Sequence, residues 1–145
     1  MSVSVHKEVK IINEKIESIT NGQVKQLKVH NNKVQLKVIP DSGYWEGILL
    51  RFNINATNYP KSPCKVKCQS QILHPNILEL DGEVCLNVFD EDWSPKLRID
   101  DYISGILYIL HNPNFDDPLS DYFCIAKEKN ELPDAIKNLI QKKAI

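Results

Sequence analysis

The spacing of apolar residues changes once near the start of the chain, and this change limits the folds that the chain can adopt. Apolar side chains recur in steps of three and four from Val5 to Ile19. Such spacing places them on one face of a helix, which we predict from about Ser4 to Ile19. Asn21-Gly22 predicts the end of that helix. After it the apolar period falls to two, which indicates strands.

Three runs of alternating apolar and polar residues follow. Asp41-Ser42-Gly43 separates the first run from the second, and Asn58-Tyr59-Pro60 with Pro63 separates the second from the third. Alternation of this kind is typical of strands with one buried and one solvated face. We therefore predict an antiparallel meander of three or four strands against the first helix. The alternating residues are Val34, Leu36 and Val38, then Ile48, Leu50, Phe52 and Ile54, and then Val66 and Cys68.

A long segment without periodicity, Gln71 to Lys96, follows the strands. Loops of this length in a compact domain are usually functional or disordered, and the apolar content here argues against disorder. Helical spacing returns from Ile99 to Leu110, and Asn112-Pro113 ends it. This order of elements predicts one α+β domain over residues 1–145. Two weaker helical patterns lie at Tyr122 to Lys129 and at Asp134 to Lys142.

Charge, hydropathy and cysteine usage argue against several classes of function. The net charge is −1, which gives no reason to propose nucleic-acid or membrane binding. No apolar run approaches the roughly 20 residues that span a bilayer. The first ten residues do not resemble a secretion signal, so we expect a cytoplasmic or nuclear protein whose thiols are reduced. Cys64 and Cys68 have no second pair at zinc-finger spacing, so no metal is expected.

Three short motifs in the long segment carry side chains suited to chemistry: His74-Pro75-Asn76, Cys85 with Leu86-Asn87, and Trp93-Ser94-Pro95. Cys85 stands out because an irregular segment leaves a thiol accessible. The other cysteines are better interpreted as small buried apolar residues. Cys85 is therefore the candidate nucleophile.

In this order, the motifs resemble the active-site signature of ubiquitin-conjugating enzymes. Tyr59-Pro60 with Pro63 resembles the proline-rich loop after the third strand of that family, and Asp116 to Leu119 resembles the loop before its later helices. The resemblance extends over essentially the whole chain. It implies an N-terminal helix, a four-stranded antiparallel meander, an active-site loop, a central helix and C-terminal helices.

The resemblance also implies a mechanism. Cys85 would take a ubiquitin-like modifier from an activating enzyme as a thioester and pass it to a substrate lysine with the help of a ligase. Asn76 would either donate a hydrogen bond to the oxyanion or brace the loop. Asp117 and Asn87 would lie near the incoming amine, although Asp117 could instead cap a helix. His74 and Pro75 would shape the loop.

Partners follow from the same resemblance. The basic face of the first helix carries Lys7 and Lys10 and would bind the activating enzyme. The alternative is that this face is an ordinary solvated helix surface. A ring-type ligase would grip two loops, and Lys61 stands where many family members place an aromatic residue. No cofactor is implied, because ATP is used by the upstream activating enzyme, and we expect a monomer. The residues expected at the ligase are Pro60, Lys61, Pro63, Trp93, Ser94 and Pro95.

The chain departs from the family pattern in two places. Eight residues, 77 to 84, separate Asn76 from Cys85, one more than the family usually has. The extra residue falls within Ile77 to Asp81, where it would either bulge outward or shift Asn76 relative to the thiol. Cys64 stands where the second proline of a pair is expected.

Within the family, three motifs are most similar to the neddylation branch, which conjugates a Nedd-type modifier to cullin scaffolds. They are Cys85 to Val88, Glu91 to Trp93, and Pro113 to Leu119. Enzymes of that branch usually carry an extension ahead of the first helix, whereas about three residues precede it here. Three explanations of the missing extension stay open: the docking tail was lost, the chain was shortened, or the protein conjugates ubiquitin itself.

Three rival functions belong to other classes. A non-catalytic relative that only binds ubiquitin would lack the active cysteine, whereas Cys85 is present. A cysteine protease would need a histidine beside Cys85, for which His74 or His111 could be nominated. A plain α+β interaction module would explain the periodicities but not the ordered run of motifs.

Overall fold

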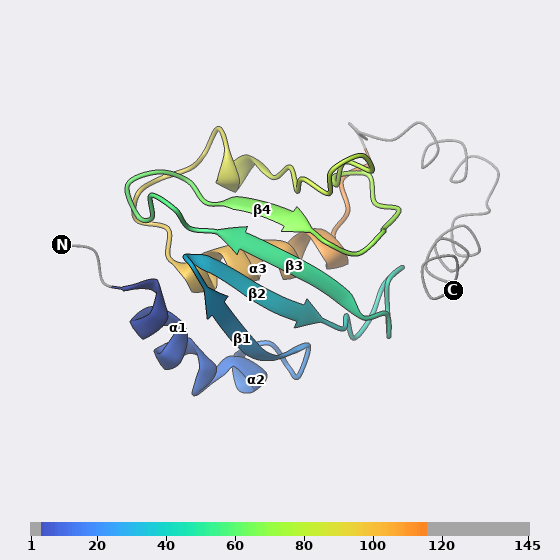
Figure 1. The fold of residues 1–145 in the computed structure, drawn as a ribbon. Helices are drawn as coiled ribbons and strands as arrows, with labels where there is room; N and C mark the ends of the chain where they lie inside the picture. Colours follow the sequence, from blue (N-terminus) through green and yellow to red (C-terminus); the bar gives the residue numbers. More distant parts are fainter. Residues whose placement is uncertain (1–3, 116–145) are drawn as a thin grey trace.

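The strands form a meander in which each pairs antiparallel with its neighbour in sequence (Figure 1). This computed structural model describes residues 4–115. The observed order β1-β2-β3-β4 confirms the predicted four-stranded antiparallel sheet. The strands are β1 (Val24–His30), β2 (Lys33–Val38), β3 (Leu50–Asn55) and β4 (Lys65–Cys68).

The first helix is shorter than the sequence predicts. The spacing predicts one helix from Ser4 to Ile19, but the structure has α1 (Val5–Asn13) and α2 (Ile16–Ile19). Lys15 leaves helical geometry at φ −132° and ψ 2°, so α2 starts in a new direction. Ile16 stays in the core, whereas Ile19 is 54% exposed, and its predicted place on the buried face is therefore wrong.

Strand β1 was not among the three alternating runs, and a bulge explains why. Its pairing with β2 shifts register between Val24 and Leu27. Both residues face the core, although they are three positions apart. A bulge inserts an extra residue and so breaks the period of two on which strand recognition depends.

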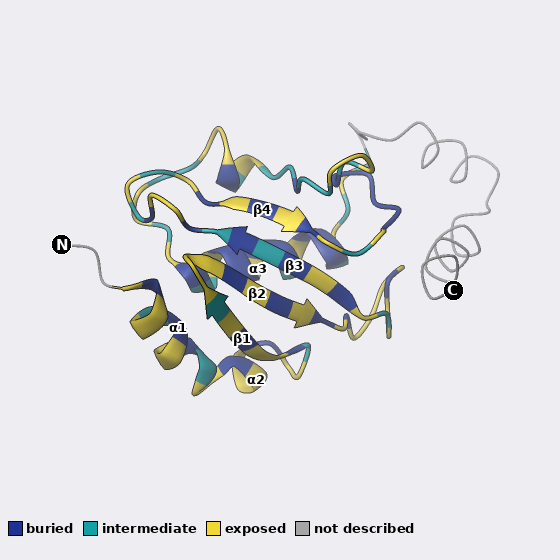
Figure 2. Ribbon diagram, in the orientation of Figure 1, coloured by how far each residue is buried: buried dark blue, intermediate teal, exposed yellow. Residues whose placement is uncertain are grey.

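The core lies between the inner face of the sheet and α3 (Ile99–His111), which runs behind the strands in Figure 1. Buried and exposed residues alternate along β2 and β4 (Figure 2), as expected for a sheet covered on one face. Trp45, from the connection between β2 and β3, is fully buried, and its indole N–H donates to the carbonyl of Leu73 at 3.1 Å. This bond fixes the start of the long loop to the core.

Both edges of the sheet are joined to other segments by hydrogen bonds. The side chain of Asn13 at the end of α1 accepts a hydrogen bond from the Leu27 N–H at 2.7 Å and donates to the Leu27 carbonyl at 3.0 Å. At the other edge, Cys68 N–H donates to Gly82 O at 2.7 Å and Val84 N–H donates to Val66 O at 3.0 Å. The long loop is therefore held to β4 by main-chain hydrogen bonds.

Part of the prediction lies outside the described residues. The helical patterns at Tyr122 to Lys129 and at Asp134 to Lys142 fall there, after residue 115. Within residues 4–115, no helix combines the length and the apolar character that a membrane crossing needs.

Asn13→Ala tests the link between α1 and the sheet edge. The substitution removes both hydrogen bonds to Leu27 and leaves a partly buried N–H without its partner. We expect the free energy of unfolding to fall by about 2–3 kcal/mol, measured by urea denaturation. The neighbouring exposed substitution Glu14→Ala should change it by less than about 0.5 kcal/mol. Equal effects of the two substitutions would contradict this role of Asn13.

Candidate active site

Residues 76–85 form a tight hairpin that presents Cys85. Ile77 and Val84 pair as an antiparallel bridge, and Cys85 N–H donates to Asn76 O at 2.9 Å. Leu78 closes the turn, because its N–H donates to Glu83 O at 3.0 Å and its carbonyl accepts from Gly82 N–H at 2.8 Å. The stretch Ile77 to Asp81, where the extra residue is expected, includes that turn. Its outermost side chain, Leu80, is 97% exposed, as an outward bulge would require.

Gly82 is required where the hairpin touches β4. Its φ is +78°, in the region that L side chains rarely adopt. A Cβ at this position would lie 2.1 Å from the carbonyl oxygen of Cys68, which is backbone and cannot rotate away. Glycine therefore permits the close approach that joins the hairpin to the sheet.

His74 is a fully buried link between the loop and α3. Its Nε2 lies 2.8 Å from the carbonyl of Ile109, and its Nδ1 accepts from the Asn76 N–H at 3.0 Å. These partners require the proton on Nε2. The ring stacks on Trp45 with centroids 4.5 Å apart, and burial lowers the pKa of His74 to about 4. The imidazole is therefore neutral at physiological pH and has both nitrogens engaged, so it does not activate Cys85.

The side chain of Asn76 is held by the main chain that follows α3. Its Nδ2 donates to Asn114 O at 3.1 Å, and its Oδ1 accepts from Asn114 N–H at 2.8 Å. Asn76 is buried, as is Pro75 before it. The observed contacts are those of a brace, and the second amide hydrogen of Asn76 has no acceptor among residues 4–115.

The thiol of Cys85 is half-buried in an acidic environment. Burial raises its pKa, and the carboxylates of Glu83, Asp90 and Asp81 raise it further. Cys64 is more strongly shielded, and burial raises its pKa to about 11. Among the described cysteines, Cys85 combines exposure with a place at the end of a rigid hairpin, whereas Cys64 and Cys68 are buried.

The segment after Cys85 packs on the middle of α3. A Cβ at Gly105 would lie 2.7 Å from the ring of Phe89 and 3.2 Å from Leu86. Because glycine has no side chain, this segment can pack closely against the helix. Asn87 starts the short 3₁₀ turn η1 (Asn87–Phe89) and is exposed beside Cys85.

One hydroxyl joins the two loops that were expected to bind a ligase. Tyr102 Oη on α3 accepts from Cys64 N–H at 3.0 Å and from Trp93 Nε1–H at 3.1 Å. Trp93 is therefore half-buried and packs against the core rather than standing free at a loop tip. Pro95 is exposed, and Ser94 is half-buried with its Oγ accepting from Lys96 N–H at 3.2 Å.

Glu8 ties α1 to the same region. Its Oε1 accepts from the Tyr59 hydroxyl at 2.7 Å and from the Ile99 N–H at 2.9 Å. In the first loop Pro60 is half-buried and follows a cis peptide bond. The remaining residues expected at partners, Lys7 and Lys10 on α1 and Lys61 and Pro63 in the loop, are exposed.

Two residues outside the motifs, Glu8 and Tyr102, organise this site together with Asn114, which lies within the motif Pro113 to Leu119 but has no expected role there. Glu8 and Tyr102 lie in helices whose apolar spacing is otherwise regular, and a polar group beside an apolar stripe is the only signal they leave. Asn114 acts through its backbone, which no residue type discloses. Asp117 lies outside the described residues.

The chemistry open to this arrangement is limited. Within residues 4–115 no group of three or more His, Cys, Asp and Glu could hold a metal ion. Cys85 has no histidine base among the described residues, because His74 is engaged with Ile109 and Asn76, and His111 instead contacts Gln23 at 2.6 Å. A thiol of this kind suits exchange with an already activated acyl group rather than attack on an amide.

Comparison with known proteins identifies a family. A sequence model described as ubiquitin-conjugating enzyme matches residues 4–142. Among curated proteins, the NEDD8-conjugating enzyme UBC12 of Kluyveromyces lactis is 47% identical over 89 residues, which are 61% of this chain and 48% of that protein. The Drosophila melanogaster Nedd8-conjugating enzyme UbcE2M is 43% identical over 93 residues, 62% of this chain and 51% of that protein. The chain thus spans about half the length of the curated relatives it matches.

Solved structures agree with the fold. Saccharomyces cerevisiae Ubc12 aligns with a TM-score of 0.65 and 40% identity over 72% of this chain and 58% of that one. A ubiquitin-conjugating enzyme domain from Toxoplasma gondii aligns with a TM-score of 0.78 over 95% of this chain and 94% of that one. At 23% identity, the second likeness supports the fold alone.

Gly82→Ala should destabilise the protein because it combines a strained φ with the contact to Cys68 O. We expect the free energy of unfolding to fall by at least about 2 kcal/mol in urea denaturation. Gly22→Ala is the matched control: its φ is +76° but nothing lies within 4 Å of the added Cβ. It should therefore cost only about 1 kcal/mol of backbone strain. If both variants lost the same stability, the contact with β4 would not be the cause.

The acidic surroundings of Cys85 should be measurable as alkylation kinetics. Because burial and three carboxylates raise the pKa of the thiol, its reaction with iodoacetamide should be slow at pH 7 and should accelerate above the ordinary cysteine range. Asp90→Asn removes one negative charge, lowers that pKa and should speed alkylation at fixed pH. Mass spectrometry of the Cys85 peptide gives the rate, and the distant exposed substitution Glu46→Gln is the control. An unchanged rate in Asp90→Asn would rule out the electrostatic cause.

Proposed function

The chain belongs to the ubiquitin-conjugating enzyme family, and from that premise we propose that it carries a ubiquitin-like modifier as a thioester on Cys85. The observation that carries this proposal is the hairpin that holds Cys85 half-exposed at its end, with no histidine base beside the thiol among the described residues. Such a thiol exchanges acyl groups but does not hydrolyse amides.

The reaction has two balanced steps. In the first, the Cys85 thiolate attacks the carbonyl at the C-terminus of the modifier, and the thiolate of the activating enzyme leaves. In the second, the neutral amine of a substrate lysine attacks the same carbonyl, the Cys85 thiolate leaves, and the proton that the amine loses as the amide forms passes to that thiolate. Exchange between thiols is nearly thermoneutral, so accessibility matters more than a depressed pKa.

The raised pKa of Cys85 suits a carrier. A thiol of higher pKa is a poorer leaving group, so its thioester is lost more slowly to adventitious nucleophiles. The carboxylates of Glu83, Asp90 and Asp81 also favour the approach of a cationic lysine side chain over that of hydroxide. Charge at this site thus supports storage of the modifier until an amine arrives.

Asn76 and its neighbours are proposed to shape the site. The two bonds from Asn76 to Asn114 support bracing as its main role, and its remaining amide hydrogen is available to an oxyanion. Asn87 is exposed next to Cys85 and could contact the incoming amine. Asp117 is proposed for the same amine, on resemblance alone.

The modifier is proposed to be of the Nedd type, transferred to cullins, because the motifs around Cys85 resemble the neddylation branch and curated relatives are named NEDD8-conjugating enzymes. Ubiquitin is the alternative. The activating enzyme would bind near Lys7 and Lys10, and a ring-type ligase would bind the loops at Pro63 and Pro95. We propose that the protein works as a monomer in the cytoplasm or nucleus, where the thiol of Cys85 stays reduced.

A charging assay tests the proposal. The protein is mixed with ATP and with either the Nedd-type modifier or ubiquitin, each with its own activating enzyme, and is resolved on non-reducing gels. We expect a thiol-sensitive band with the Nedd-type modifier, no band in Cys85→Ala, and a thiol-resistant ester in Cys85→Ser. Cys64→Ala is the control and should charge normally, because Cys64 is buried.

The other outcomes are equally informative. Charging with ubiquitin alone would replace the Nedd-type assignment with the alternative. If neither modifier charges the chain, a docking tail from a neddylation enzyme is grafted ahead of Ser4. A tailed chain that still stays uncharged would mean that Cys85 is not a carrier.

A further inference from the structure

The C-terminal end of α3 is held by a cluster of polar side chains outside the candidate active site. His111 ends this helix, and its side chain is 23% exposed. Its Nε2 lies 2.6 Å from Gln23 Oε1 and 3.6 Å from Asp41 Oδ1, and its Nδ1 lies 3.2 Å from Ser42 Oγ. Asp41 is fixed in turn, because Asn21 Nδ2 donates to its other oxygen at 3.0 Å. The ring therefore joins α3 to the start of β1 and to the connection between β2 and β3.

The partners of His111 indicate which ring nitrogens carry protons. Gln23 Nε2 donates to Thr20 O at 3.0 Å, and Gln23 Oε1 accepts from Asp41 N–H at 3.1 Å, so this oxygen is the group that faces the ring. Nε2 of His111 must then be a donor. Ser42 has one hydroxyl hydrogen, which it donates to Asp41 Oδ1 at 3.3 Å. Nδ1 of His111 must therefore also donate, so the doubly protonated imidazolium makes every bond of the cluster.

The charges around His111 also favour a cation. The last turn of α3 leaves carbonyl groups without intrahelical partners, and these give the helix end a partial negative charge. Asp41 adds a carboxylate beside the ring. Tyr44 and Glu46 line the same hollow of about 780 Å³ as His111, so Glu46 adds a second carboxylate. On β1, Lys25 is ion-paired at 2.9 Å with a glutamate of α2.

Loss of one proton would break part of this cluster. If Nδ1 of His111 became an acceptor, the Ser42 hydroxyl would turn toward it and leave Asp41 Oδ1 without that bond. The charge pair between the ring and Asp41 would be lost as well. Because imidazole is the side chain that commonly changes charge between pH 5 and 8, the cluster is built to weaken as pH rises through this range.

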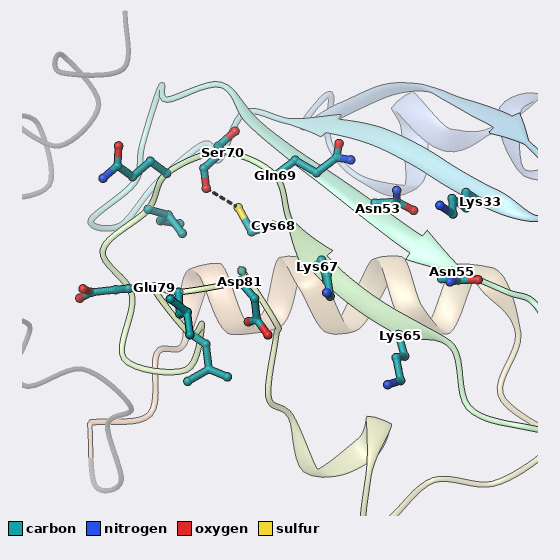
Figure 3. A pocket seen from close by; sticks show the side chains of 15 residues that line it. Lys33, Asn53, Asn55, Lys65, Lys67, Cys68, Gln69, Ser70, Glu79 and Asp81 are labelled. Atoms are coloured by element: carbon teal, nitrogen blue, oxygen red, sulfur yellow. Dashed lines mark hydrogen bonds between the residues drawn. The ribbon is translucent and has the colours of Figure 1, made fainter.

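The ionisable groups closest to the Cys85 hairpin are distinct from this cluster. Burial lowers the pKa of His74 to about 4, and it raises the pKa of the Cys85 thiol. The hairpin residues Glu79 and Asp81 line a hollow beside β4 (Figure 3), whereas His111 lines the one beside the segment after α3. A change in that segment near neutral pH therefore points to His111.

A short main-chain path leads from His111 to the hairpin. Two residues separate His111 from Asn114, and one of them is Pro113. Proline fixes its own φ and restricts the residue before it, so a displacement at the helix end is passed on rather than absorbed. The N–H and the carbonyl of Asn114 both bind the Asn76 side chain, and Asn76 O accepts from Cys85 N–H.

The connection between β2 and β3 holds the other end of the same segment. The ring of Phe115 meets that of Tyr44 edge-on, with centroids 6.0 Å apart. Asp41 and Ser42 of this connection hold His111. Residues 112–114 are thus fixed on both sides by one connection.

We propose that His111 is a positioning residue whose imidazolium, bound by Gln23, Ser42 and Asp41, fixes residues 112–114 and through them Asn76. The hairpin of Cys85 is then held more firmly when the ring carries both protons than when it carries one. His111 acts only through Asn114 and Asn76. The consequence for transfer from Cys85 rests on the proposed function, whereas the consequence for the Asn76 brace does not.

The first test is hydrogen exchange of the Asn114 N–H in the full chain, followed by NMR and corrected for the intrinsic rate. It is measured at about pH 5.5 and about pH 8.5, on either side of the range in which imidazole ordinarily titrates. His111→Gln keeps a donor but cannot carry charge, so it should lower protection about fivefold at the lower pH and less than about twofold at the higher. His30→Gln, the same substitution at an exposed histidine, should change neither value.

Two further measurements separate the cluster from a general loss of stability. Asp41→Asn should reproduce the loss at the lower pH, and its combination with His111→Gln should add no further loss, because both act on one ion pair. The Val84 N–H, which donates to Val66 O at 3.0 Å, should keep its protection within about twofold in every variant.

The second test is single-turnover discharge of the modifier from Cys85 onto free lysine at the same two pH values. The ionisation of lysine is common to all variants and cancels when rates are divided. The unaltered protein should be about threefold faster than His111→Gln at the lower pH, and the two rates should agree at the higher pH.

Three results would overturn the proposal. They are protection of the Asn114 N–H that does not depend on pH in the unaltered protein, equal losses in His30→Gln and His111→Gln, and a discharge ratio that is the same at both pH values. A chain that takes up no modifier contradicts the proposed function instead. The exchange measurement still decides in that case whether His111 holds the brace of Asn76.

Discussion

The arrangement around Cys85 depends on one buried imidazole. His74 lies among apolar side chains with both nitrogens engaged, one with the last turns of α3 through Ile109 and the other with the N–H of Asn76. A buried polar ring is tolerated only when its hydrogen bonds are satisfied, so the loop has little freedom to adopt another path. Burial also keeps the ring neutral. His74, the residue type most suited to proton transfer, therefore has a structural role: it fixes the position of the segment that leads into the Cys85 hairpin.

Charge is distributed in opposite senses over the molecule. The loop that carries Cys85 is acidic, and its carboxylates raise the pKa of the thiol, whereas the outer sheet surface is basic. The near-zero net charge conceals this separation. Two surfaces of opposite sign favour contacts with molecules of opposite charge.

Much of the fold could be predicted from the sequence, because a strand or helix with one buried face leaves its period in the residue types. The alternating runs of β2, β3 and β4 and the spacing of α3 are examples. Prediction failed where the backbone, not the side chains, carries the information. The bulge in β1 interrupts the period of two by which the strand would be recognised. The break at Lys15 leaves no sign in the sequence, because helical apolar spacing continues through it.

The same distinction applies to the site. Cys85, Asn76 and His74 could be identified from their residue types in order along the chain, but their contacts could not. Trp93 was expected as an exposed anchor, yet its indole N–H finds the hydroxyl of Tyr102, nine residues away and across a turn. A hydrogen bond of this kind depends on tertiary geometry, so it cannot be predicted from residue type or spacing.

The pair of hydrogen bonds between Asn76 and the backbone of Asn114 has a thermodynamic consequence. The Cys85 N–H donates to the carbonyl of Asn76. Asn76 therefore contacts both the residue that carries the thiol and the segment after α3. Any molecule that binds more tightly when residue 114 is displaced must also change the free energy of the hairpin. By linkage, an acyl group that strained the hairpin from Cys85 would alter the affinity of residue 114 for such a molecule by the same factor. Under the proposed function, the acylated and the free thiol would then differ in what residue 114 binds, without any large movement of the fold.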